Sequence, residues 1–256
     1  MTGPSRGPSV AVVTGASRGL GSKTVQDLVA AGFTVAACAR APRAPATGET
    51  LYRSVDVGDS PSVDHFLKEV GARFGRIDVL VNNAGYANVP TPILETEDAT
   101  AEQSFRVNAL GPIAFVRRVL PIMLAQPEGG VIINIASRAG VTPVPRLAAY
   151  SASKSALVSF TLAAAKELTD EKILLVALCP AGMNTEMRAS LYGAEDANVQ
   201  MDPARVSKLV VELASQRTVG GVRVSSGSAI IVAKEGPATV LEWPTDARGH
   251  KSLRFD

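Results

Sequence analysis

The 256-residue chain has few cysteines and histidines, and no marked excess of charge of either sign. Its 26 Lys and Arg nearly balance its 24 Asp and Glu, which argues against a nucleic-acid or anionic-membrane partner. The two cysteines, Cys38 and Cys179, lie in separate apolar stretches, as is typical of reduced core thiols in a cytoplasmic protein. His65 and His250 have no second ligand at a useful spacing. We therefore expect no metal site.

Long apolar runs are also lacking. No uninterrupted run reaches the roughly 18 residues that a membrane-spanning helix needs, so we expect no membrane partner. Residues 1–9 are rich in Gly, Pro, Ser and Arg, and we interpret them as a short disordered lead rather than a secretion signal. No repeat or linker divides the remainder. Residues 10–256 are thus predicted to form a single domain with a substantial core.

Short apolar runs alternate with stretches of helical periodicity along most of the chain. Strands that are apolar on both faces and alternate with helices form a parallel sheet. Right-handed crossovers then give an α/β fold, with a doubly wound, mostly parallel sheet and helices on both faces. Strands are predicted at 10–13, 33–39, 51–57, 77–81, 131–135 and 173–178, and helices at 20–31, 62–74, 96–124, 148–169 and 203–214.

Two segments of this pattern need separate comment. Gly111-Pro112 falls inside the helical stretch 96–124 and predicts a bend there. Near the end, the runs 229–232 and 239–243 flank a Gly-Pro turn, which predicts a C-terminal hairpin.

A glycine-rich segment separates the first predicted strand from the first predicted helix. Gly15, Gly19 and Gly21 have the spacing G-x-x-x-G-x-G. Glycines let the backbone approach a pyrophosphate, and a helix N-terminus offers free N–H groups and a positive dipole end. A ligand-free turn can have the same composition. Its position in the first βα unit favours dinucleotide binding.

Two arginines indicate which dinucleotide is bound. The second predicted strand ends at Arg40, with no acidic residue there to bind the ribose 2′-hydroxyl of NAD. Arg18 lies in the glycine-rich segment. Two guanidinium groups can hold a 2′-phosphate through charge-assisted hydrogen bonds. We therefore expect NADP(H) to be favoured over NAD(H); the alternative is that both arginines are merely solvated.

Tyr150 and Lys154 lie four residues apart in the predicted helix 148–169, so their side chains share one face. A fixed ammonium beside a phenol lowers the phenol's pKa from about 10 towards the range of an acid/base catalyst. Isolated pairs of this kind are common on ordinary helices. Their meaning depends on what surrounds them.

Taken with its other motifs, the chain resembles the short-chain dehydrogenase/reductase family, of the NADP(H)-preferring type, from residue 10 to about residue 185. The resemblance implies a Rossmann-like fold. It is carried by 14–21, Asp56-Val57, 82–85, 107–111, Ser137, 150–154 and 180–182.

The resemblance implies catalytic roles for four residues. Tyr150 is the general acid/base, and Lys154 lowers its pKa and binds the nicotinamide ribose. Ser137 hydrogen-bonds the substrate oxygen, and Asn108 holds a water that relays protons to Lys154. Residues that would contact the cofactor along its length are Gly15, Ser17, Arg18, Gly19, Leu20, Gly21, Arg40, Asp56, Val57, Asn83, Ala84, Gly85, Tyr150, Lys154, Pro180, Gly182 and Thr185.

The implied activity is hydride transfer between NADP(H) and a carbonyl or secondary alcohol. Candidate pocket walls at 86–94, 138–147 and a substrate loop at about 183–202 are rich in apolar residues, which favours reduction of a largely apolar ketone. Arg138, Arg146 or Arg188 could meet an anionic group.

Two other functions stay open. One is an NAD-dependent alcohol or dihydrodiol dehydrogenase. The other is a non-catalytic nucleotide-binding scaffold, which the presence of all four catalytic residues argues against. By analogy with relatives we expect a cytoplasmic homodimer or homotetramer that acts on a small molecule.

Overall fold

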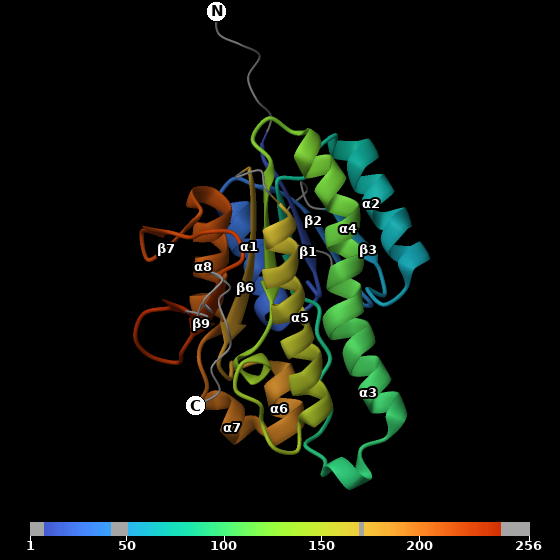
Figure 1. Ribbon diagram of the computed structural model, residues 1–256, viewed down its shortest axis with the longest axis vertical. Helices are drawn as coiled ribbons and strands as arrows, with labels where there is room; N and C mark the ends of the chain where they lie inside the picture. Colours follow the sequence, from blue (N-terminus) through green and yellow to red (C-terminus); the bar gives the residue numbers. More distant parts are fainter. Residues whose placement is uncertain (1–7, 42–50, 169–171, 242–256) are drawn as a thin grey trace, which may run out of the picture.

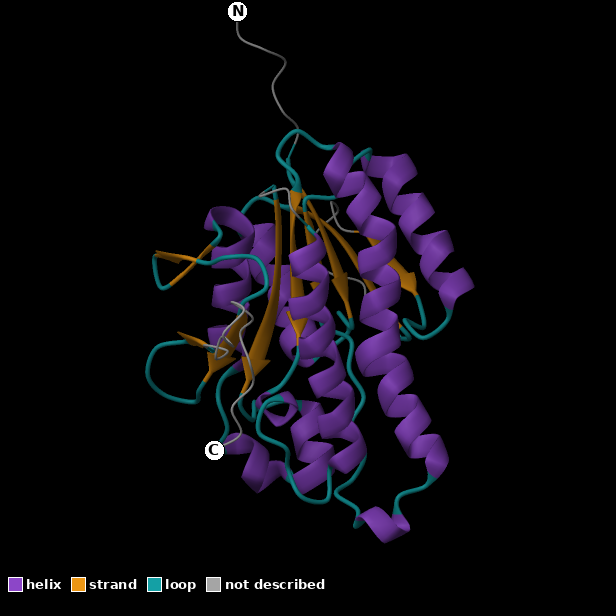
Figure 2. Cartoon of the chain, in the orientation of Figure 1, coloured by secondary structure: helices purple, strands orange, loops and turns teal. Residues whose placement is uncertain are grey.

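The computed structural model describes residues 8–41, 51–168 and 172–241. Most of the predicted lead and the end of the chain lie outside these ranges. An eight-stranded sheet occupies the centre, in the order β10-β9-β6-β5-β4-β1-β2-β3, and helices cover both of its faces (Figures 1 and 2). The predicted Rossmann-like fold is confirmed.

Seven strands of the sheet are parallel, and the last is antiparallel to its neighbour, which confirms the predicted hairpin. A separate pair, β7 (Thr218–Val219) and β8 (Val222–Arg223), has no counterpart in the sequence prediction. The main strands are β1 (Val10–Thr14), β2 (Thr34–Ala39), β3 (Leu51–Ser54), β4 (Val79–Asn82), β5 (Gly130–Ile135), β6 (Ile173–Pro180), β9 (Ala229–Val232) and β10 (Thr239–Val240).

The helices divide between the two faces of the sheet, with α1 and α8 on one and α2, α4 and α5 on the other. The bounds are α1 (Gly19–Ala30), α2 (Ser60–Phe74), α3 (Asp98–Phe105), α4 (Gly111–Ala125), α5 (Ala148–Glu167), α6 (Glu186–Tyr192), α7 (Ala194–Asn198) and α8 (Pro203–Gln216). Three short turns complete the set: η1 (Ile93–Glu95), η2 (Arg106–Leu110) and η3 (Arg138–Gly140).

Strand β1 shows why the sheet is buried on both faces. Ala11 and Val13 pack with α1 and α8, whereas Val10 and Val12 pack with α2 and α4. Side chains alternate across a strand, so only a strand that is apolar throughout can fill both cores. The strand order reverses next to β1, whose neighbours are β2 and β4. In such sheets ligands bind at this switch point, beyond the carboxyl ends of the strands.

The bend predicted at Gly111-Pro112 is instead a π-helical turn, η2, directly before it. The backbone N–H of Gly111 donates to the carbonyl of Arg106, five residues back. Proline has no N–H, so Pro112 cannot donate to the carbonyl of Asn108 four residues earlier. The wider turn accommodates this missing donor.

By length and composition, the helical stretch Asp98–Ala125 could cross a membrane. Within its most apolar window, 50% is buried inside the structure. A helix that covers a core sheet passes the same test, so this stretch is weak evidence for a membrane span.

Candidate active site

The glycine loop between β1 and α1 has no room for side chains at Gly15 and Gly21. Gly15 and Gly19 have φ of 66° and 52°, which favour glycine. A Cβ on Gly21 would lie 2.2 Å from the carbonyl oxygen of Gly15, and one on Gly15 would lie 2.6 Å from Cα of Ala84. Arg18 precedes α1 and provides no side-chain cap. The first turn of α1 thus presents uncapped N–H groups, which suit an anion.

The side chains of Asn83 and Thr14 hold this loop in place through hydrogen bonds. The Asn83 amide nitrogen donates to the carbonyls of Thr14, at 2.9 Å, and Gly15, at 3.0 Å. The Thr14 hydroxyl accepts from the backbone N–H groups of Asn83, at 3.1 Å, and Ala84, at 3.0 Å. Asn83 was predicted as a cofactor contact, and no role was predicted for the Thr14 side chain. In the structure the Asn83 amide nitrogen is engaged in shaping the loop.

A cleft of about 630 Å³ joins the glycine loop to α5 and α6. Four predicted residues do not line it: Pro180, Gly182, Asn108 and Ser137. The predicted residues that do are Gly15, Ser17, Arg18, Gly19, Leu20, Gly21, Arg40, Asp56, Val57, Asn83, Ala84, Gly85, Tyr150, Lys154 and Thr185. Others that the sequence did not single out as cofactor contacts are Ala39, Ala41, Val55, Val107, Ile135, Ala136, Met183, Glu186 and Met187.

Lys154 is buried on α5, with 4% of its surface exposed. Its Nζ donates to the carbonyl of Ile135, the last residue of β5, at 2.8 Å. Burial lowers the pKa of Lys154 from 10.5 to about 8, because the interior disfavours the charged ammonium. The amine is therefore held at the carboxyl end of β5, and Lys154 lines the cleft.

Tyr150 lies one turn before Lys154 and also lines the cleft. Burial raises the pKa of Tyr150; a hydrogen bond with the Ser137 side chain opposes this rise, and Tyr192 adds to it. The lowered pKa expected from Lys154 is thus wrong as a net result, because desolvation outweighs the other influences. Although Ser137 does not line the cleft, this hydrogen bond brings it to the Tyr150 hydroxyl.

Asn108 is fully buried in η2, and its side chain is hydrogen-bonded on both sides. Its Oδ1 accepts from the N–H of Tyr86 at 2.9 Å, and its Nδ2 donates to the Tyr86 carbonyl at 2.8 Å. The same Nδ2 lies 2.9 Å from the Ser153 hydroxyl on α5. The side chain therefore ties the segment after β4 to α5. A water-holding role would fall to the backbone carbonyl, which Pro112 leaves without its usual donor.

The predicted substrate loop is closed at its base. Met183 and Met201 form a β-bridge, and the N–H of Met201 donates to the carbonyl of Gly182 at 3.1 Å. A Cβ on Gly182 would lie 2.4 Å from Oε1 of Gln200. Gly182 was predicted as a cofactor contact, and in the structure it packs against this base.

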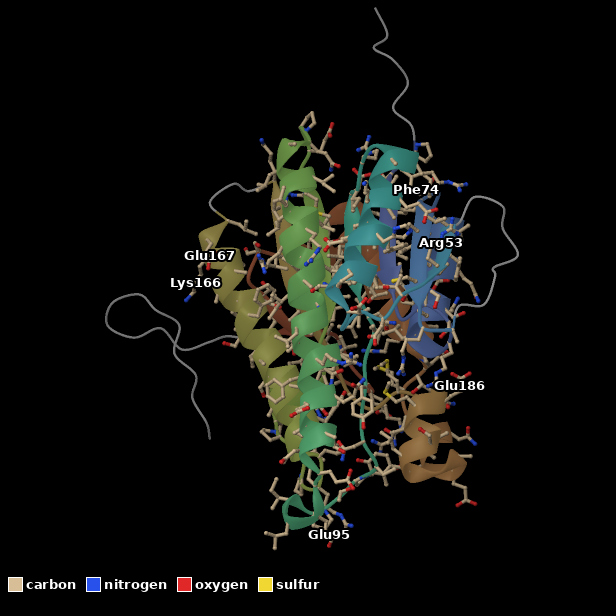
Figure 3. The ribbon with its side chains drawn as sticks, turned by 90° about the vertical axis from the view of Figure 1, so that its right-hand side faces the viewer. Arg53, Phe74, Glu95, Lys166, Glu167 and Glu186 are labelled. Carbon is tan, nitrogen blue, oxygen red and sulfur yellow. The ribbon has the colours of Figure 1, made fainter. Side chains whose placement is uncertain are left out.

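Within the loop, α6 approaches the glycine loop. Glu186, at the end of α6 nearer the sheet (Figure 3), lies 4.0 Å from the Arg18 guanidinium. Arg188 pairs with Asp196 and stacks 3.8 Å from the ring centre of Tyr192. Arg188 is therefore engaged within the loop and does not serve as the free cation considered from the sequence.

Three comparisons with known proteins agree with this geometry. The family model described as short chain dehydrogenase matches residues 9–196. An uncharacterized oxidoreductase of Schizosaccharomyces pombe is 35% identical over 188 residues, which cover 71% of this chain but only 63% of that protein. Galactitol 2-dehydrogenase of Agrobacterium fabrum is 36% identical over 183 residues, covering 69% of this chain and 71% of the relative.

A solved structure extends the likeness to most of the chain. The 3-ketoacyl-(acyl-carrier-protein) reductase from Brucella melitensis, complexed with NADH, superposes with a TM-score of 0.80 at 27% identity. The match covers 88% of this chain and 97% of that one. On the family match and these relatives, the chain belongs to the short chain dehydrogenase family of oxidoreductases.

Proposed function

We propose that this protein is an NADP(H)-dependent carbonyl reductase that reduces a largely apolar ketone. One observation carries the proposal: Tyr150, Lys154 and the glycine loop line the same cleft, and Ser137 is hydrogen-bonded to Tyr150. A proton donor and a phosphate-binding loop would then share one cavity, as hydride transfer to a carbonyl requires.

The cleft fits a nicotinamide dinucleotide. Gly15 and Gly21 let the loop backbone pack directly against Ala84 and against itself, and α1 begins there without a side-chain cap, so the free N–H groups of its first turn can accept a pyrophosphate. Asp56 and Val57 would border the adenine, and Thr185 the nicotinamide end. When bound, the cofactor would supply the hydride.

The chain's own residues would supply the proton and stabilise charge. As negative charge develops on the substrate oxygen, the hydroxyls of Tyr150 and Ser137 would donate hydrogen bonds to it. Tyr150 would then transfer its proton. Burial raises the pKa of Tyr150, which favours the protonated phenol, the form that donates in reduction. Lys154 would fix the nicotinamide ribose, and the Asn108 backbone carbonyl would hold a relay water.

The preference for NADP(H) rests on Arg18 and Arg40, which are exposed and line the cleft. Their guanidinium groups would pair with a 2′-phosphate. The contact of Arg18 with Glu186 favours the alternative, an NAD-dependent alcohol or dihydrodiol dehydrogenase, because it engages one of the two cations.

Fluorescence titration with NADPH and NADH decides between these cofactors. We expect tighter binding of NADPH, and a loss of roughly tenfold in NADPH affinity for Arg40→Ala, the size of one charge-assisted contact. NADH affinity should change little. Arg117→Ala on α4, an exposed residue away from the cleft, is the matched control. Equal affinities for both cofactors, before and after Arg40→Ala, would refute the NADP(H) assignment.

The substrate class rests on apolar side chains that line the cleft together with Tyr150. These are Met183 and Met187, and a hydrophobic wall of this kind would bind an apolar ketone. A panel of ketones of increasing polarity, followed at the nicotinamide absorbance, should give the highest kcat/KM for apolar members. A preference for charged or polyhydroxylated members would contradict this assignment.

We also propose a cytoplasmic homodimer or homotetramer without a nucleic-acid or membrane partner. Phe105, Leu110 and Leu124 are 38%, 58% and 43% exposed along α3, η2 and α4, and such side chains favour burial in a contact between copies. Light scattering of the purified protein tests this, since a monomer would contradict it.

A further inference from the structure

We propose that Arg106 is a positioning residue that holds the Asp56 carboxylate for recognition of the cofactor's adenine ring. The inference rests on the proposed function, because it presupposes that an adenine dinucleotide occupies the cleft. It begins from an ion pair between two residues that lie 50 positions apart in the chain.

Both oxygens of Asp56 are held. Oδ1 accepts from the backbone N–H of Gly58 at 2.9 Å, and Oδ2 accepts from Nη2 of Arg106 at 3.2 Å. Nε of Arg106 donates in turn to Oε1 of Gln103, at 3.1 Å. Asp56 lines the cleft and Arg106 does not. Any influence of Arg106 on a ligand would therefore pass through the carboxylate.

The packing around Arg106 shows that its position is built into the fold. A Cβ on Gly58 would lie 2.7 Å from Cγ and 3.1 Å from Nε of Arg106. The aliphatic part of the Arg106 side chain therefore packs directly on the backbone of Gly58, in the position that a Cβ would occupy. Gly111, which closes the η2 turn onto Arg106, would bring a Cβ within 2.9 Å of the Val57 carbonyl. The segment 56–58 is thus clamped between Arg106 and the start of α4.

The chemistry of the held carboxylate selects an amino group. Each oxygen of Asp56 keeps acceptor capacity beyond its one bond, and the 6-amino group of adenine is a donor. A 6-oxo group, as in hypoxanthine, would face the carboxylate with a second acceptor and be rejected. Among the described residues that line the cleft, Glu186 is the other carboxylate, and it lies on α6 (Figure 3). Holding Asp56 in place reduces the ordering cost when the base binds.

The test compares NADPH with its deamino analogue, in which hypoxanthine replaces adenine. We expect the wild-type protein to bind NADPH more tightly. Arg106→Met keeps the stem against Gly58 but removes the guanidinium, and should reduce this preference roughly three- to tenfold. Arg106→Lys should retain part of it. The kcat at saturating NADPH should not change, and Arg117→Met, from the same helical stretch, should leave the preference intact.

A double-mutant cycle separates positioning from general damage. Asp56→Asn should lower the base preference at least as much as Arg106→Met, and adding Arg106→Met to it should lower the preference no further. An unchanged preference in Arg106→Met, a further loss in the double variant, or a wild-type protein that does not distinguish the two bases would each overturn the inference. Failure of the wild-type protein to bind either cofactor would instead contradict the proposed function. Thermal midpoints confirm that each variant is folded.

Discussion

The glycine loop and the candidate pocket wall 138–147 differ in which residues adopt the left-handed backbone conformation. In the glycine loop the positions with positive φ are Gly15 and Gly19, where glycine is unstrained. In the candidate wall just before α5, the residue with positive φ is Arg146, with φ of 65°. A non-glycine residue there costs on the order of 1 kcal/mol. The glycine loop therefore adopts its shape without backbone strain, whereas the candidate wall retains a strained residue.

Hydrogen bonds connect the wall 138–147, which contains Arg146, to the candidate wall 86–94 and to α5. The carbonyl of Arg146 accepts from the N–H of Thr91 at 2.8 Å, and the Ser151 hydroxyl receives the N–H of Val144 at 3.2 Å. These bonds join 138–147 to 86–94 and to α5. Contacts with neighbouring segments, rather than local backbone preference, therefore hold the candidate wall 138–147 in place.

The largest effect is expected in the glycine loop. Gly21→Ala would place a Cβ 2.2 Å from the Gly15 carbonyl oxygen, so the loop must shift. We expect a loss of about 3 kcal/mol in the free energy of unfolding, measured by urea denaturation, together with loss of cofactor binding. The matched change is Gly71→Ala in α2, where nothing lies within 4 Å; it should stabilise by about 0.5–1 kcal/mol. Similar outcomes for both variants would disprove the idea that the loop has no room.

An intermediate effect on the free energy of unfolding is expected at Lys154. Its folded pKa is about 8, against 10.5 when unfolded. Between these values the unfolded state binds more protons, so wild-type stability rises with pH through this window. Lys154→Met removes the desolvation cost of a buried ammonium group. It should be more stable than wild type by roughly 1–3 kcal/mol at pH 7, with the difference shrinking towards pH 10.

Urea denaturation at pH 7 and pH 10 measures this difference. Lys166→Met, on the exposed part of the same helix (Figure 3), is the control and should show little dependence on pH. A Lys154→Met variant that is less stable than wild type at pH 7 would mean that the amine's hydrogen bond to Ile135 outweighs its desolvation.

The smallest effect on stability is expected at Arg146. Arg146→Gly relieves the left-handed conformation and should stabilise the protein by about 0.5–1 kcal/mol, read from thermal unfolding. Cofactor affinity should not change, because Arg146 does not line the cofactor cleft. Destabilisation would show that the arginine side chain makes up for its backbone strain.

The sheet and the glycine loop could be predicted because their constraints are local. A strand such as β1 must be apolar on both faces, and a loop that touches Ala84 must lack a Cβ at Gly15. The pair Tyr150 and Lys154 is likewise one helical turn, so its geometry follows from its spacing.

Other features depend on contacts that no local pattern encodes. The ion pair of Arg106 with Asp56 joins residues that are 50 positions apart and meet only in the folded chain. The Asn83 amide is hydrogen-bonded to the glycine loop because β1 and β4 are neighbours in the sheet. The net pKa of Tyr150 depends on burial rather than on spacing. The π-helical turn did have a signal in the sequence. Pro112 has no N–H to donate to the carbonyl of Asn108, four residues earlier, so a regular α-helix cannot form all its hydrogen bonds there.

The central claim is that Tyr150 donates the proton in nicotinamide-dependent reduction of a ketone. The most direct measurement is NADPH oxidation by wild type and Tyr150→Phe with the best ketone of the panel, alongside NADPH titration of both proteins. Since only the proton donor is lost, we predict a fall in kcat of roughly 100- to 10,000-fold with cofactor affinity within about twofold. Retained turnover in Tyr150→Phe would contradict the account.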